Sequence, residues 1–241
     1  MTQLQRLTIT AAQQAAQPMQ LTEAQRHYLC RVLRLRAGDR FIAMDGQRCW
    51  LATLQADLTT ALCLEEWPMT TELPVAVTLL IALPKTGMDD IVRQTTEIGV
   101  RRIVPILSQR SLLNPGASKQ ARWLKIAQEA AEQSERQFIP EILPPQDWRS
   151  ALAAYPDQRN QPAYLCEARG SYPHLLTRLK PPLAAQLTLA VGPEGGWTEA
   201  ELAEAVAVGY QPVSLGARIL RAVTAPLVAL SLVAAVAELQ A

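Results

Sequence analysis

From residue 75 onward, short apolar runs alternate with segments of helical periodicity, and this alternation constrains the fold of the 241-residue chain most strongly. Strands that are joined through helices run parallel in one sheet, so the alternation predicts an α/β domain over 75–241 with a mostly parallel sheet. The apolar runs are Val75–Leu83, Ile103–Leu107, Ala163–Cys166, Leu187–Val191 and Pro212–Leu215. The expected helices cover 88–98, 119–133, 172–179, 199–208 and about 224–239.

The first 70 residues differ, because their short β-type segments are separated by turn residues and accompany a single helix. Thr22 followed by Gln25 is a capping-box pattern, which predicts a helix over 23–33. The pair Asp45-Gly46 predicts a hairpin turn. Strands are expected over 40–44, 48–55 and 58–65. The segment 67–74 holds two prolines and is expected to link a domain over 1–70 to one over 75–241.

Several classes of protein are excluded by what the chain lacks. The four cysteines form no C-x-x-C pair and there are only two histidines, so no metal site is expected. Isolated cysteines of this kind indicate buried thiols in a reducing compartment. Residues 1–16 are polar, without the apolar core of a signal peptide. The longest uncharged run, 222–237, is too short to span a membrane and predicts a buried helix. A cytoplasmic protein without a membrane partner is therefore expected.

The net charge of +1 conceals an uneven distribution. Residues 26–48 carry six basic and two acidic side chains, and residues 93–136 carry eight and four. Residues 182–241 are acidic, with two basic and five acidic side chains. Nineteen of the 23 basic residues are arginine, which is suited to bidentate recognition of phosphates and base edges. The two basic blocks are compatible with a nucleic-acid backbone, although solvated charged surfaces would give the same pattern.

The stretch that is most informative about chemistry is G-P-E-G-G at 192–196, between an apolar strand and a helix. Thr198, with Glu201 three residues later, is a capping box that predicts where this helix begins. Glycines at such a junction let the backbone approach a ligand closely. The loop lacks the lysine of a phosphate-binding loop, and Glu194 would repel phosphate. A ligand with hydroxyl, amine or positive groups suits it better, and an ordinary turn is the alternative.

A second stretch, L-G-A-R-I-L-R-A-V-T-A at 215–225, also follows a short strand and precedes a helix. Gly216 permits a tight turn there. Arg218 and Arg221 are the only basic residues after Lys180. An arginine beside a ligand loop can stabilise an anionic group, although a solvated arginine near a helix start is the alternative.

Three further stretches carry weaker signals. Lys85, after the strand that ends in L-P-K, could contact phosphate, and Glu97 lies at the end of the next helix. E-Q-S-E-R at 132–136 closes another helix. His27, Arg31 and Arg34 are spaced so that they would share one face of a helix, which could follow a nucleic-acid backbone.

The five stretches, in this order, resemble the RsmE family of bacterial methyltransferases, which act on uracil N3 of 16S ribosomal RNA. The resemblance extends from about residue 20 to the end of the chain, and the G-P-E-G-G and L-G-x-R-I-L-R motifs are its most specific part. It implies a PUA-like small β-barrel that grips RNA and a C-terminal SPOUT α/β domain whose last segment forms a trefoil knot. It also implies S-adenosylmethionine as cofactor, the small subunit as substrate and a homodimer.

The resemblance further implies roles for individual residues. Arg221, Arg136 and Glu97 are the expected catalytic residues, and Arg31, Arg34, Lys85 and Arg110 are expected to bind RNA. The cofactor is expected to contact Leu189, Gly192, Glu194, Gly195, Gly196, Leu215, Gly216, Ile219, Leu220 and Thr224.

The sequence departs from the family pattern near this expected site. Val223 stands where the family commonly has a glutamate, Gln109 replaces another glutamate, and Glu135 stands where a small residue is common. The candidates for a general base are then Glu97, Glu132 and solvent. Two other functions stay open on the sequence alone: a methyltransferase of the same fold that acts on another RNA base, and a non-catalytic RNA-binding protein.

Overall fold

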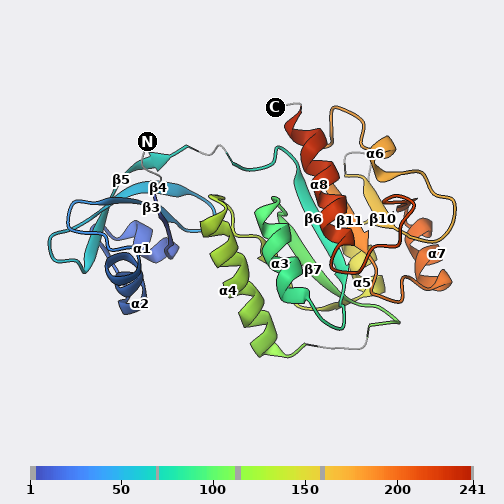
Figure 1. Ribbon diagram of the computed structural model, residues 1–241, viewed down its shortest axis with the longest axis horizontal. Coiled ribbons are helices and arrows are strands. Elements are labelled where there is room, and N and C mark those ends of the chain that lie inside the picture. The colour runs from blue at the N-terminus through green and yellow to red at the C-terminus, as the bar shows by residue number, and fades with distance from the viewer. Residues whose placement is uncertain (1–3, 69–70, 112–114, 158–160, 240–241) are drawn as a thin grey trace. The chain divides into compact units, whose positions relative to one another are not determined.

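The computed structural model describes residues 4–68, 71–111, 115–157 and 161–239, which form two compact units (Figure 1). The first unit comprises residues up to Glu72 together with Ala131–Ile139, and the second comprises Leu73–Ala130 and Pro140–Ala241. The segment 131–139 therefore belongs to the first unit, although it lies well inside the sequence range of the second. Helix α4 (Ala117–Gln133) contributes residues to both units.

The first unit is built on a curled five-stranded sheet of order β1-β3-β4-β5-β2. Strands β3 (Arg40–Met44), β4 (Cys49–Leu54) and β5 (Thr60–Trp67) form an antiparallel meander and confirm the three predicted strands. The edge strands β1 (Arg6–Thr8) and β2 (Met19–Gln20) are three and two residues long, and the sequence pattern did not reveal them. Side chains from all five strands enclose one apolar core with Leu29.

The predicted helix over 23–33 is confirmed only at its start. Thr22 and Gln25 form the expected capping box, and α2 (Glu23–His27) begins there, after a short α1 (Ala11–Ala15). The chain then widens into one π-helical turn, η1 (Tyr28–Val32), and Arg34 adopts a left-handed conformation with φ of 59°. The expectation that His27, Arg31 and Arg34 share one helical face is therefore wrong, because the π turn changes the period and the helix ends before Arg34.

The second unit contains a seven-stranded, all-parallel sheet of order β12-β10-β11-β6-β7-β8, in which β9 also pairs with β7. The apolar runs predicted from the sequence correspond to β6 (Ala76–Ala82), β7 (Arg102–Leu107), β10 (Ala163–Cys166), β11 (Gln186–Val191) and β12 (Gln211–Val213). The predicted α/β fold is confirmed. Strands β8 (Glu141–Ile142) and β9 (Gln146–Asp147) were missed, since two residues carry no periodicity.

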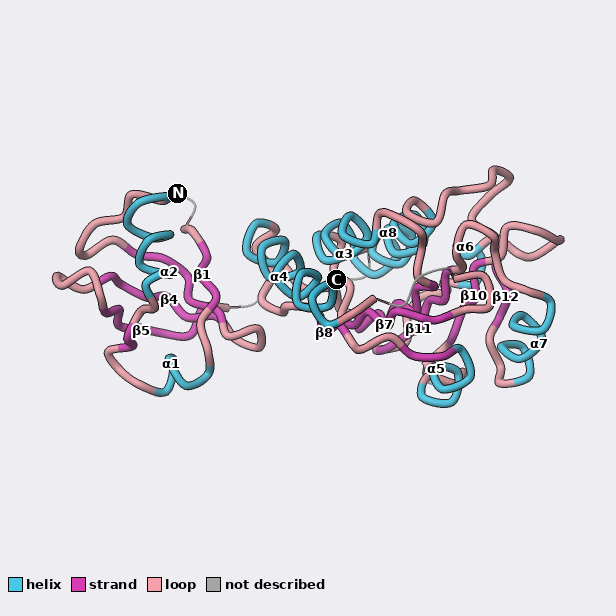
Figure 2. The backbone as a smooth tube through the Cα atoms, turned by 90° about the horizontal axis from the view of Figure 1, so that it is seen from below, coloured by secondary structure: helices cyan, strands magenta, loops and turns pink. Residues whose placement is uncertain are grey.

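Helices cover both faces of this sheet (Figure 2). Helices α3 (Met88–Glu97) and α8 (Ala225–Glu238) lie on one face, and α5 (Trp148–Ala154) and α7 (Glu199–Ala207) on the other. A short α6 (Leu175–Arg178) precedes β11. Under α5 and α7, alternate residues of the strands pack with Trp148 and Tyr210 into one core. Helix α8 is the helix expected at 224–239, but it is buried on one side only, through residues such as Ala229, Leu230 and Val233. The described part of the chain contains no helix that could cross a membrane.

Because the sheet is parallel, its strands all end at the same edge. The loops that follow β10, β11 and β12 meet at this edge, where open α/β sheets bind their ligands. The threading of the last segment as a trefoil knot stays a prediction.

Candidate active site

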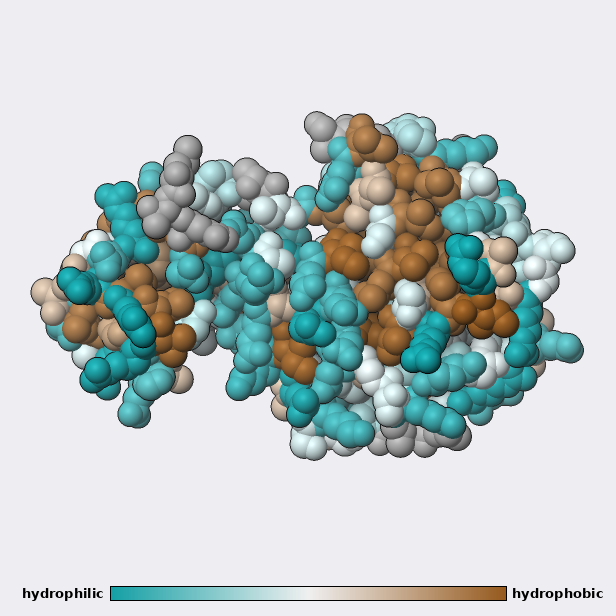
Figure 3. All heavy atoms as spheres, in the orientation of Figure 1, coloured by the Kyte–Doolittle hydropathy of each residue, from teal (hydrophilic) through white to brown (hydrophobic). Residues whose placement is uncertain are grey.

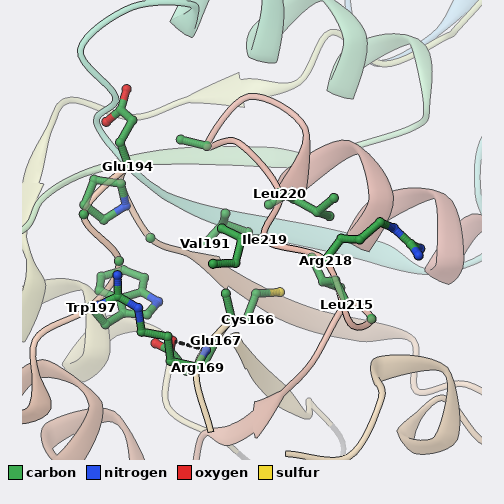
Figure 4. A pocket seen from close by; sticks show the side chains of 18 residues that line it. Cys166, Glu167, Arg169, Val191, Glu194, Trp197, Leu215, Arg218, Ile219 and Leu220 are labelled. Carbon is green, nitrogen blue, oxygen red and sulfur yellow. Dashed lines mark hydrogen bonds between the residues drawn. The ribbon is translucent and has the colours of Figure 1, made fainter.

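A pocket opens at the carboxyl edge of the parallel sheet, within the second unit (Figure 4). Three loops form it: one follows β10, one follows β11 and carries G-P-E-G-G, and one follows β12 and carries L-G-A-R-I-L-R. The lining residues are Cys166–Arg169, Val191–Trp197, Leu215, Gly216, Arg218–Leu220, Ala222 and Ala225. Two motifs that are 23 residues apart in sequence thus share one cavity, because each follows the end of a strand in the same sheet.

The structure brings together eight of the ten residues that the sequence assigned to a cofactor. They are Gly192, Glu194, Gly195, Gly196, Leu215, Gly216, Ile219 and Leu220. Leu189 lies inside β11 and is fully buried, and Thr224 is the exposed residue before α8, so neither lines the pocket. Cys166, Glu167 and Trp197 line it but were not foreseen; only the capping box beside Trp197 marked that region.

The Glu194 side chain points away from the apolar lining at Val191 and Leu220 (Figure 4). Its carboxylate accepts a hydrogen bond from the backbone amide of Lys85 at 3.0 Å. Glu194 therefore connects the G-P-E-G-G loop to the loop after β6. The second carboxylate of the pocket is that of Glu167, which directly follows β10, is half-buried and lines the pocket. The Glu167 carboxylate accepts a hydrogen bond from the Arg169 amide at 2.8 Å.

Trp197 is 6% exposed, and its ring stacks on Trp148 with 4.4 Å between the ring centroids. Its indole Nε1 is buried and has no hydrogen-bond partner among the described residues. A Cβ added to Gly192 would lie 3.2 Å from this nitrogen, so the indole edge sits directly against the loop backbone. An unsatisfied buried donor is uncommon in a folded protein, and this one belongs to a residue that lines the pocket.

Arg110, which is expected to bind RNA, contacts the G-P-E-G-G loop. Its Nη1 donates to the carbonyl oxygens of Gly195 and of Trp197, the latter at 3.2 Å. The neighbouring amide of Gln109 donates to the Glu201 carboxylate at 2.7 Å. Glu201 is also the partner of Thr198 in the capping box, which is confirmed. The loop after β7 thus stabilises the G-P-E-G-G loop and the start of α7.

Arg221 lies beside the pocket, between the lining residues Leu220 and Ala222, and its side chain is exposed. Arg218 lines the pocket itself and is also exposed. The position where the family commonly has a glutamate is occupied by half-buried Val223, which packs against Gly87: a Cβ on that glycine would overlap the valine methyl group at 2.4 Å. No carboxylate stands there.

The other two expected catalytic residues do not line the pocket. Arg136 belongs to the first unit, where it is 2% exposed and pairs with Glu72 at 2.7 Å. Glu97 is exposed at the last turn of α3. Since α3 runs back from the carboxyl edge of the sheet, Glu97 lies at the amino edge, opposite the pocket. Glu132 accepts a hydrogen bond from the Thr8 amide within the first unit.

The residues expected to bind RNA lie in three places. Arg31, in η1, and Arg34, two residues after the end of η1, are exposed on the first unit. Lys85 is exposed on the loop after β6, next to the G-P-E-G-G loop. Of these four residues, only Arg110 has a side chain that donates a hydrogen bond to the backbone of a loop that forms the pocket.

Comparison with known proteins also finds two domains, although the match to the second domain includes the segment 131–139 that packs with the first unit. Residues 71–234 match the family model of an RNA methyltransferase domain, and residues 21–60 match that of an RNA methyltransferase PUA domain. A curated protein of Synechocystis sp., named ribosomal RNA small subunit methyltransferase E, is 47% identical over 238 residues, which cover 97% of this chain and 78% of that protein. A protein of the same name from Bacillus subtilis is 31% identical, with 91% and 90% covered.

A solved structure extends the similarity to three dimensions. The ribosomal RNA small subunit methyltransferase E of Neisseria gonorrhoeae, bound to S-adenosyl methionine, superposes with a TM-score of 0.80 at 29% identity. The superposition covers 99% of this chain and 97% of that one. Both units are thus shared with relatives along almost the whole sequence, and the chain belongs to the RsmE family of RNA methyltransferases.

Proposed function

We propose that this protein transfers a methyl group from S-adenosylmethionine to N3 of a uridine in the 16S ribosomal RNA of the small subunit. The observation that supports this most strongly is that the G-P-E-G-G and L-G-x-R-I-L-R loops line the same pocket. The Neisseria relative, whose structure holds S-adenosyl methionine, has the same fold over both units.

The lining of the pocket fits this cofactor in chemical type. The indole N–H of Trp197, which has no partner among the described residues, can donate to an acceptor of the ligand. Gly192 has no side chain, so the backbone of the loop faces the ligand at that position. The half-buried Glu167 carboxylate suits hydroxyl groups or a positive centre. Leu215, Ile219 and Leu220 supply apolar surface. When bound, the cofactor supplies an electrophilic methyl group on a positively charged sulfur.

The chain's own contribution to the reaction concerns the uracil. The N3–H bond must break as the N3–carbon bond forms, and negative charge develops on the uracil oxygens. The exposed guanidinium of Arg221, beside the pocket, can stabilise that charge. Glu97 lies at the opposite edge of the sheet, and Glu132 accepts a hydrogen bond from Thr8 in the first unit. We therefore infer that the proton of uracil N3 is released to solvent and not to either carboxylate.

The substrate would be held by a second surface. The first unit matches an RNA methyltransferase PUA domain, and it exposes Arg31 and Arg34 for contacts with RNA phosphates. An RNA of the small ribosomal subunit implies that the protein works in the cytoplasm.

We also propose that the protein forms a homodimer. Hydrophobic side chains gather over the face of the second unit that carries α8 (Figure 3). On and beside that helix, Leu227, Val228 and Leu232 are only half-buried and Ile219 is 75% exposed. Apolar surface of this kind usually marks an interface. Light scattering during gel filtration should give twice the mass of the chain, and the mass of one chain would refute the dimer.

The function itself is tested with small ribosomal subunits that lack the modification and S-adenosylmethionine labelled in its methyl group. Digestion to nucleosides and mass spectrometry should show N3-methyluridine, and label on another base, or no label, would reject the proposal. Arg221→Ala should lower the turnover by about 100-fold, because it removes one preorganised donor, while cofactor affinity is retained. Arg149→Ala is the matched control, since Arg149 is an exposed arginine that pairs with Glu204.

A further inference from the structure

A second cavity in the same unit lies between the start of α3 and the amino-terminal half of α4, which run side by side (Figures 1 and 2). We call it the α3–α4 groove; it is lined by Leu83–Asp90, Pro115, Lys119, Arg122 and Trp123. Its volume of about 670 Å³ falls within the range of about 300–1,000 Å³ that is usual for ligand sites. Among its lining residues only Lys85 was expected to bind RNA, and the other residues of the groove have no role in the proposed chemistry.

The charges in the α3–α4 groove leave a positive excess. The Asp89 carboxylate accepts from Arg122 Nε at 2.7 Å and from Trp123 Nε1 at 3.1 Å. Asp90 is paired with Arg93 at 2.7 Å. The ammonium groups of Lys85 and Lys119, both exposed, have no ion-pair partner among the described residues. The two lysines are therefore available to bind an anion, whereas the two aspartates are each paired with an arginine.

The rest of the groove suits the phosphate–ribose chain of a nucleic acid. Its floor is apolar, since Leu83, Met88 and Trp123 are at most 7% exposed. The amino end of α3 opens into it, and the residue before that helix, Gly87, has no side chain to cap the first turn. The first backbone N–H groups of a helix have no partner within the helix, and they favour an acceptor such as a phosphate oxygen.

The loop after β6, which lines the groove, contacts the loops of the cofactor pocket. The amide of Lys85 donates to Glu194 in the G-P-E-G-G loop, and Gly87 packs tightly on Val223 in the loop after β12. A strand of RNA that lies in the groove would therefore be next to the loops that form the pocket.

We infer that the α3–α4 groove binds the phosphodiester backbone of single-stranded RNA beside the nucleotide that is methylated, with Lys85 and Lys119 as its phosphate contacts. This inference rests on the proposed function, since it deepens how the substrate of that reaction is held. It adds an RNA contact on the catalytic unit, independent of the exposed arginines of the first unit. Contacts of this type position a substrate without reading its sequence.

The test compares the full-length protein with Lys85→Ala/Lys119→Ala. The probe is a fluorescein-labelled, single-stranded, uridine-rich RNA of about 12 nucleotides, within the span such sites occupy. Anisotropy titrations over a series of salt concentrations give the affinity and its salt dependence. Two lost phosphate contacts should reduce the slope of log K against log salt by about 1.4, since each contact to a single strand contributes about 0.7. Affinity for S-adenosylmethionine and the melting temperature should stay at wild-type values.

Two further variants keep the outcome clear. Lys125→Ala removes a lysine on the same helix that pairs with Glu129 outside the groove, and it should leave the slope unchanged. Lys85→Arg/Lys119→Arg retains both charges and should retain RNA binding. An unchanged slope in the double alanine variant would overturn the inference, as would equal loss in Lys125→Ala. Uridine monophosphate that binds the wild type as tightly as the RNA does would also overturn it, because the groove would then hold a mononucleotide.

These measurements are made without methyl transfer, so they separate the two hypotheses. If N3-methyluridine forms and the salt slope does not change, the proposed function stands and the groove hypothesis fails. If the slope changes while no uridine is methylated, the groove binds RNA and the proposed reaction is wrong.

Discussion

The guanidinium of Arg136 donates to the carboxylate of Glu72 through Nη2 at 2.7 Å and through Nε at 3.2 Å, and both side chains are almost completely buried. The other oxygen of the same carboxylate accepts the backbone amides of Gln137 and Phe138, at 2.9 and 3.0 Å. Glu72 thus binds both the side chain and the backbone of one loop. This ion pair fixes the segment 131–139 to the first unit, which favours a structural role for Arg136.

Arg136→Ala should therefore act on stability. It leaves the Glu72 carboxylate buried without its cation, a change that costs about 3–5 kcal/mol. Urea unfolding at neutral pH measures the loss. Arg102→Ala is the control, because the pair of Arg102 with Glu141 is partly exposed and should contribute less than about 1 kcal/mol. Normal stability with a large loss of turnover would instead support the catalytic role expected from the sequence.

The ion pair of Arg136 with Glu72 also shows which residue roles could not be predicted from the sequence. The loops at 192–196 and 215–225 could be predicted as ligand loops, because glycine clusters between a strand and a helix have a local physical meaning. Arg136 could not be interpreted, because its partner is 64 residues away and the sequence shows only one more arginine in a basic block. Trp197 was missed for the same reason: its importance lies in an unpartnered N–H, which depends on tertiary packing.

Trp197→Phe should weaken cofactor binding about three- to tenfold, the effect of losing one hydrogen bond between neutral groups. Phenylalanine keeps an aromatic ring against Trp148 but removes the donor at Nε1. Isothermal titration with S-adenosylmethionine measures the change.

Trp148→Phe is the matched control for this prediction. The Trp148 indole donates to the backbone carbonyl of Glu201 at 3.1 Å and does not line the pocket. Its loss should lower stability and leave the affinity nearly unchanged. Equal effects of both variants on affinity would mean that the Trp197 nitrogen has no special part in binding.

Gly87→Ala should be more damaging than an alanine at Gly38, although the two glycines have nearly the same backbone conformation, with φ of 87° and 85°. Alanine in this left-handed region costs about 1–2 kcal/mol at either position. At Gly38 nothing lies within 4 Å of the added Cβ, whereas at Gly87 it would lie 2.4 Å from Val223 Cγ1. We expect a further loss of about 1–3 kcal/mol at Gly87, from overpacking, in urea unfolding.

The clash can be tested by combining variants. Val223→Ala removes the methyl group that the new Cβ would meet, so Gly87→Ala/Val223→Ala should recover part of the additional loss. Gly87→Ala should also weaken cofactor binding, because Val223 lies in the loop between the pocket residues Ala222 and Ala225, and the double variant should recover part of that affinity. If the two single glycine variants are equally stable, the contact between Gly87 and Val223 is not tight.

The thiol of Cys166, in the wall of the pocket, should make the stability depend on pH in the alkaline range. Burial raises the pKa of this thiol from 9.0 to about 12, and the nearby charge of Glu167 adds to the effect. Above pH 9 the unfolded chain releases the thiol proton while the folded protein keeps it, so the free energy of unfolding falls as the pH rises toward 12. The slope contributed by one proton is at most about 1.4 kcal/mol per pH unit. In urea unfolding without cofactor, the free energies of unfolding of Cys166→Ala and of the wild type should differ by a constant amount below pH 8. Above pH 9 the free energy of unfolding of Cys166→Ala should fall less steeply than that of the wild type. Curves that stay parallel up to pH 11 would show that the thiol ionises equally in both states.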